Sequence, residues 1–140
     1  MSKKIFVSFD YENDKHYKHL LEAWHNNRQF DFTFRDMSSS EINSSDIGRV
    51  KAALTNKINQ ATHTLVLVGR YANSQHSDHN LIGYKNWINF EIAKSKENNN
   101  KLIAVQLDSN VALPNELINE RVSWARNFTE ANIISAIEAA

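Results

Sequence analysis

Aromatic and acidic side chains alternate in the segment that follows the first apolar run of the chain. Phe9 and Tyr11 are interleaved with Asp10 and Glu12. Aromatic rings can stack on a planar ligand and hold its geometry, while carboxylates accept hydrogen bonds and stabilise positive charge. These residue types predict a binding site here. A phospho-receiver site is excluded, because it also needs an aspartate after the run Thr64–Val68, where this chain has Gly-Arg.

Glu91 is the second candidate for chemistry. It lies four residues after Trp87 and three after Ile88, so the three side chains share one face of a helix. A carboxylate on a tryptophan-bearing face tends to be desolvated, which tunes its affinity for protons and its ability to stabilise a nearby cation. The spacing alone favours a plainer interpretation, namely an ion pair with Lys94 or Lys85, or a partly exposed glutamate.

Two further groups of residues give weaker indications of a binding site. Arg70 directly follows an apolar run, so it could bind a phosphate at the end of that strand, although a structural ion pair is an equally good interpretation. His76, Asp78 and His79 lie close together in the sequence. Loop histidines at this spacing without further ligands are usually solvated, so we predict no metal site.

The apolar patterns predict the elements that position these residues. Continuous apolar runs at Ile5–Phe9, Thr64–Val68 and Leu102–Val105 are typical of strands buried on both faces of a parallel sheet. The segment Phe30–Arg35 alternates aromatic and polar residues, which favours a sheet edge. A weak fifth strand is predicted at Val122–Ala125.

Helical spacing of apolar residues fills the gaps between these strands. The first helix is predicted around Tyr17–Trp24, capped by Asn13 or Asp14. The side chains of its apolar stripe, namely Tyr17, Leu20, Leu21 and Trp24, are predicted to lie in the core. The remaining helices are predicted at Ile47–Ile58 after the cap-rich start Ser44-Ser45-Asp46, at Trp87–Ser95, around Glu116–Asn119, and after a cap at Thr129.

This alternation predicts one α/β domain over residues 1–140, with three layers and helices on both faces of a parallel sheet. Placing the second strand at an edge agrees with the flavodoxin-like order 2-1-3-4-5. Ligands of such sheets bind at the switch point, beyond the carboxyl ends of the first and third strands. The loops Asp10–Asp14 and Gly69–Tyr84 should therefore form the site.

Composition excludes several other classes of protein. The 16 Lys+Arg and 16 Asp+Glu give a formal net charge of zero, which argues against bulk nucleic-acid binding. The three glycines are too scattered for a phosphate loop, and the absence of cysteine excludes thiol chemistry and zinc fingers. Without a signal-like start or a run of ~20 apolar residues, we expect a cytoplasmic protein with no membrane partner.

Three segments together resemble a known family. Residues 4–14, Lys-Ile-Phe-Val-Ser-Phe-Asp-Tyr-Glu-Asn-Asp, resemble the S-F-x-Y-x-x-D opening of the TIR-like domain in the Thoeris antiphage system. Residues 64–69 resemble the third strand of that family. Residues 87–95, Trp-Ile-Asn-Phe-Glu-Ile-Ala-Lys-Ser, are similar to its W-x-x-x-E-I-x-K-S helix. The resemblance covers most of residues 3–107.

The resemblance implies a TIR-type fold that acts on NAD as substrate, with no resident cofactor. Enzymes of this kind cleave the bond between nicotinamide and ribose, as an NAD⁺ nucleosidase does. Thoeris members resemble ADP-ribosyl cyclases, whose cyclic ADP-ribose-type product diffuses to a separate effector protein. Carried over to this chain, the resemblance implies that Glu91 is the catalytic glutamate and that its surroundings are Phe9, Asp10, Tyr11 and Trp87.

Two other functions stay open at this point. TIR domains also serve as non-catalytic adaptors, and near-zero net charge favours self-association into a homo-oligomer. A flavin-binding electron carrier ranks low, because the first loop lacks the hydroxyl- and glycine-rich phosphate loop of flavodoxins. The polar stretch Ser74–Asn86 is longer than the usual turn of the TIR-like family, so we expect it to reshape substrate access.

Overall fold

The computed structural model describes residues 3–26, 32–34 and 46–140. The five described strands form a parallel sheet in the order β2-β1-β3-β4-β5. They are β1 (Lys3–Ser8), β2 (Phe32–Phe34), β3 (His63–Val68), β4 (Lys101–Gln106) and β5 (Val122–Ala125). This order confirms the flavodoxin-like prediction, with β2 at an edge. Residues 30, 31 and 35 of the strand predicted there lie outside the described residues.

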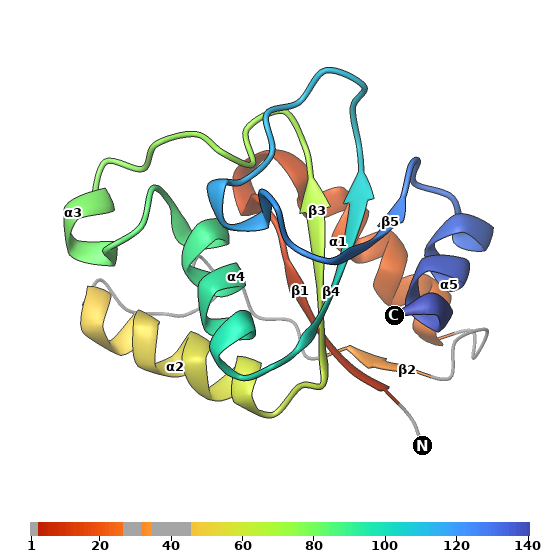
Figure 1. Cartoon of the computed structure of the whole chain (residues 1–140), viewed down its shortest axis with the longest axis horizontal. Helices are drawn as coiled ribbons and strands as arrows, with labels where there is room; N and C mark the ends of the chain where they lie inside the picture. The colour runs from red at the N-terminus through yellow and green to blue at the C-terminus, as the bar shows by residue number, and fades with distance from the viewer. Residues whose placement is uncertain (1–2, 27–31, 35–45) are drawn as a thin grey trace.

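Helices cover both faces of this sheet (Figure 1). On one face lie α1 (Tyr11–Asn26) and α5 (Glu130–Ala139), and on the other lie α2 (Ile47–Asn59) and α4 (Trp87–Glu97). Two short helices lie in connections, α3 (His79–Ile82) and the 3₁₀ helix η2 (Asn115–Leu117). The sequence predicted η2 within about one residue at its start and did not predict α3.

Alternate residues of the central strands contribute to cores on opposite faces. In β3, Leu65 and Leu67 pack with residues of α1 and α5, whereas Val66 and Val68 pack with residues of α4. All four side chains are fully buried, which explains why this strand is a continuous apolar run. Because parallel strands end at the same edge, the segments that follow β1 and β3 meet at the switch point.

The start of α1 differs from the prediction. Asn13 and Asp14, the predicted caps, both lie inside the helix. Asp10 takes the capping role, because its backbone carbonyl accepts a hydrogen bond from the Asp14 amide at 2.7 Å and its Oδ1 accepts one from the Glu12 amide at 3.1 Å. The apolar stripe begins only at Tyr17, so its spacing could not predict where the polar first turn of the helix starts.

The apolar stripe of α1 is also narrower than predicted. Leu21 is 1% exposed, but Leu20 is 44% exposed, so the prediction of a core position for Leu20 is wrong. Tyr17 and Trp24 pack against Phe128, with ring centroids 4.8 and 5.1 Å apart. The helix therefore presents one row of side chains to the sheet, and the neighbouring row faces outward.

Candidate functional site

A pocket of about 280 Å³ opens at the switch point. Three segments line it: the β1–α1 connection, the stretch between β3 and α4, and the first turn of α4. The lining residues are Phe9, Asp10, Glu12 and Asn13, then Tyr71, Ser74, Gln75 and His76, and finally Asn86, Trp87 and Ile88. The pocket thus lies between the two loops that the strand order indicated, and its size is near the lower limit for small-molecule sites.

Three of the residues proposed from the sequence line this pocket, namely Phe9, Asp10 and Trp87. Tyr11 is the first residue of α1, and its side chain lies outside the described part of the chain. Arg70 is not among the lining residues. Its Nη2 lies 3.4 Å from Oδ2 of Asp108 in an exposed ion pair, which is the structural alternative that the sequence left open.

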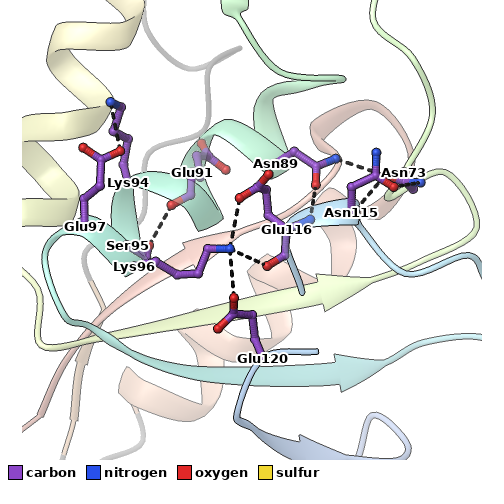
Figure 2. Close-up of polar contacts among 10 residues, drawn as sticks. All are labelled: Asn73, Asn89, Glu91, Lys94, Ser95, Lys96, Glu97, Asn115, Glu116 and Glu120. Carbon is purple, nitrogen blue, oxygen red and sulfur yellow. Dashed lines mark hydrogen bonds and ion pairs between the residues drawn. The ribbon is translucent and has the colours of Figure 1, made fainter. Parts of the chain in front are cut away.

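Glu91 lies one helical turn beyond Trp87 and is not part of the pocket lining. It is 2% exposed, so the alternative of a partly exposed glutamate is wrong. The hydroxyl of Ser8 donates to its Oε1 at 2.6 Å, a length typical of a hydroxyl donating to a carboxylate. The hydroxyl of Ser95 donates to its backbone carbonyl at 2.7 Å (Figure 2). The hydrogen bond from Ser8 connects the side chain of Glu91 to the end of β1, whereas the one from Ser95 lies within α4.

Asp14 is a second buried carboxylate at the switch point, and its burial had no signal in the sequence. Its side chain is 8% exposed, and its Oδ2 accepts no hydrogen bond from the described residues. Burial, followed by the nearby charge of Asp10, raises the pKa of Asp14 to about 6, while His16 acts in the opposite direction. The carboxyl group rests on Gly69, where any Cβ atom would collide with it.

The described lining of the pocket is acidic and aromatic. Asp10 and Glu12 supply carboxylates, Phe9, Tyr71 and Trp87 supply rings, and no lysine or arginine is among these residues. Aromatic faces and negative potential favour a planar or cationic group. A phosphate group would find no lysine or arginine partner in this lining.

The stretch after β3 contributes most of the lining that no motif indicated. Ser74, Gln75, His76 and Asn86 lie within or border the segment that was expected to reshape access. His76 Nδ1 accepts a hydrogen bond from the amide of Asp78 at 2.9 Å. Within residues 3–26, 32–34 and 46–140, no group of three or more His, Cys, Asp or Glu side chains could hold a metal ion.

The start of α4 is fixed by a helix cap. The side-chain carbonyl of Asn86 accepts a hydrogen bond from the amide of Asn89 at 2.9 Å, so Trp87 occupies the first position of the helix. Since residues four apart share a helix face, this start also sets the orientation of Glu91.

The described helices include none with the length and apolar character needed to span a bilayer.

Comparison with solved structures shows what this fold is similar to. The crystal structure of a prokaryotic SEFIR domain matches with a TM-score of 0.59 and 14% sequence identity, over 99% of this chain and 95% of that chain. At this identity the likeness shows the fold alone. A comparison with curated proteins finds no significant match.

The family comparison is more specific. A family profile described as "Thoeris protein ThsB, TIR-like domain" matches residues 6–112. The matched segment is more than half of the chain and contains the pocket-lining residues together with Glu91. It confirms the resemblance seen in the sequence motifs. The chain therefore belongs to the TIR-like domain family of the Thoeris protein ThsB.

Proposed function

We propose that this protein is a TIR-type enzyme that consumes NAD by cleaving the bond between nicotinamide and ribose. The observation that carries the proposal is an acidic, aromatic pocket at the switch point, with the carboxylate of Glu91 one helical turn beyond Trp87. Membership in the ThsB TIR-like family is compatible with this activity.

The lining of the pocket suits the nicotinamide end of NAD. The pyridinium ring is planar and cationic, so it can stack on the ring of Trp87 or Phe9. The carboxylates of Asp10 and Glu12 favour its positive charge. The pyrophosphate would then extend out of the pocket. Arg70 stays a candidate for binding it, on condition that its guanidinium leaves the exposed ion pair.

One carboxylate is enough for this chemistry. When the bond between C1′ and nitrogen breaks, the electron pair leaves with nicotinamide, which departs as a neutral molecule. No general acid is needed, in contrast to ordinary glycosidases. The ribose gains oxocarbenium character, which a carboxylate can stabilise, and we assign this role to Glu91. Water then gives ADP-ribose, whereas attack by a nucleophile of the same molecule gives a cyclic product.

Catalysis through Glu91 requires a local movement. The carboxylate is buried and does not line the pocket. Side chains that line the pocket must therefore shift when substrate binds, so that the carboxylate can reach the ribose. Until then the hydrogen bond from Ser8 holds the carboxylate in a defined position.

The proposal includes the fate of the product. By analogy with Thoeris cyclases, NAD is the substrate, no cofactor is resident, and a cyclic ADP-ribose-type molecule carries the signal through the cytoplasm to a separate effector protein in antiphage defence. Assembly into a homo-oligomer belongs to the same proposal, since a net charge of zero favours self-association.

A second function is favoured by the burial of Glu91. If the carboxylate never reaches the pocket, its role is structural, because it joins α4 to the end of β1 through Ser8. The protein would then be a non-catalytic interaction module with a TIR-like fold.

Mass spectrometry of NAD incubated with the protein distinguishes these functions. The enzyme should release nicotinamide together with ADP-ribose or its cyclic, dehydrated form. Trp87→Leu should reduce turnover about ten-fold or more by removing a stacking surface. Trp124→Leu, which changes a tryptophan on β5 outside the pocket lining, is the matched control. Intact NAD with both wild type and control would favour the interaction module.

A further inference from the structure

The side chain of Asn86 joins two segments of the pocket wall. Its Nδ2 donates to the backbone carbonyls of Ala72 and Ser74, each at 2.9 Å. Its Oδ1 accepts from both the backbone amide and the Nδ2 of Asn89, each at 2.9 Å. One buried amide therefore connects the stretch after β3 with the first turn of α4.

The network continues from Asn89 to the connection between β4 and β5. The Nδ2 of Asn89 also donates to Oδ1 of Asn73 at 3.1 Å, and its Oδ1 accepts from the amide of Glu116 at 2.9 Å. Asn73 in turn exchanges hydrogen bonds with Asn115, through the amide of that residue at 3.0 Å and its side chain at 3.2 Å. Figure 2 shows the side chains of Asn73, Asn89 and Asn115 meeting.

The hydrogen-bonding capacity of Asn86 is fully used by these contacts. An asparagine side chain has two N–H donors and two acceptor lone pairs, and here the protein satisfies all four. Asn86 lines the pocket, yet its side chain has no donor or acceptor left for a ligand. Its contribution to the site is therefore to hold other groups in place.

The groups that it holds are those that shape the pocket. Ser74 is itself a lining residue, and Tyr71 and Gln75 lie within three residues of the two carbonyls that Asn86 binds. On the other side, the cap at Asn86 places Trp87 at the start of α4. If the amide were lost, the stretch after β3 would lose two of its hydrogen bonds to the start of the helix that carries Trp87.

We propose that Asn86 and Asn89 are positioning residues of the pocket, which fix the wall formed by residues 71–76 against the first turn of α4. This role belongs to the site of the proposed function, and only the measurement of KM for NAD rests on that function. Polar recognition of the ligand then falls to other lining residues, such as Asp10, Gln75 and His76.

Asn86→Ser separates this role from helix capping. Serine is a good N-cap residue, so the acceptor for the amide of Asn89 is retained. The donor to the two carbonyls is lost. Amide hydrogen exchange in residues 71–76 should rise about ten-fold, while exchange in residues 89–97 of α4 should stay within about two-fold of wild type. The KM for NAD should rise by a similar factor, with a smaller change in kcat.

Asn86→Asp serves as the second variant. It keeps the cap acceptor but places a carboxylate against the carbonyls of Ala72 and Ser74, so the same exchange pattern should be stronger. Asn56→Ser, at an exposed position on α2 that is not part of the pocket lining, should change neither exchange nor KM.

Amide hydrogen exchange tests the positioning role of Asn86 without any measurement of catalysis. Unchanged exchange in residues 71–76 of Asn86→Ser and Asn86→Asp would overturn it, and so would an equal rise throughout α4. If the expected pattern is found but wild type leaves NAD intact, the positioning role stands and the proposed function fails.

Discussion

Asp14 shows how a single residue at the switch point affects the whole fold. Its carboxyl group is buried over Gly69, and one of its oxygens has no partner among the described residues. An ionised carboxylate in such a place destabilises the folded state, because desolvation is not offset by hydrogen bonds. The first motif of the sequence contains Asp14, but nothing in its spacing distinguishes a buried acid from a solvated one.

The stability of the protein should therefore depend on pH through Asp14. The pKa of about 6 in the folded state exceeds the ordinary value of 3.8. The folded state thus binds more protons than the unfolded state between these values, and stability should fall as pH rises from about 4 to 6.5. Asp14→Asn should remove this decline and raise stability at pH 8 by about 1–3 kcal/mol.

Urea denaturation of wild type and Asp14→Asn at pH 4, 6 and 8 measures this effect, with pH values chosen around the stated pKa. Asp78→Asn is a suitable control, because the side chain of Asp78 makes no capping hydrogen bond at the start of α3. Parallel stability profiles for wild type and Asp14→Asn would show that Asp14 does not titrate in this range.

At the scale of elements, α4 organises the site. Its apolar residues Ile88 and Ile92 pack on the sheet, whereas Asn89, Glu91 and Ser95 are polar and also buried. The apolar spacing predicted the helix over Trp87–Ser95, and the structure extends it to Glu97. It could not predict the buried polar contacts, because their partners lie in segments far away in the sequence.

Lys96 of α4 anchors the connection that contains η2. Its Nζ binds the backbone carbonyl and Oε1 of Glu116, at 2.9 and 3.0 Å, and Oε1 of Glu120 at 3.2 Å (Figure 2). Burial lowers the pKa of Lys96, but the hydrogen bonds and charges of the two glutamates outweigh it, and the net pKa is raised. This lysine is therefore a charged side chain held between two elements.

Lys96→Met should loosen that connection. Methionine keeps much of the apolar stem but loses the three polar contacts, so the free energy of unfolding should fall by about 1 kcal/mol. Amide exchange in residues 115–120 should rise, as measured by mass spectrometry. Lys94→Met is the matched control, since Lys94 pairs with Glu97 at the helix surface. Equal effects of the two substitutions would contradict a specific role for Lys96.

At the scale of the whole molecule, the order of the strands decides where chemistry can occur. Continuous apolar runs indicated the buried parallel strands, and the alternating pattern of Phe30–Arg35 indicated an edge. Together they were enough to place the pocket between the first and third strands. Its walls were harder to predict, because the stretch after β3 carries no periodic pattern, and side-chain contacts such as those of Asn86 depend on the folded arrangement.

The fold also places Glu91 and the pocket within one helical turn of each other without exposing the carboxylate. The central claim is that this carboxylate supports cleavage of NAD after side chains that line the pocket move. A glutamine has nearly the same shape and can still accept a hydrogen bond from Ser8, so Glu91→Gln removes the charge with little change in packing.

The rate of nicotinamide release from NAD by wild type and Glu91→Gln is the most direct test of this claim. Loss of the charge that stabilises an oxocarbenium-like ribose should lower the rate about 10²–10⁴-fold. Glu97→Gln, which changes an exposed glutamate later in α4, should retain the wild-type rate. Equal rates for wild type and Glu91→Gln would contradict the assignment of Glu91.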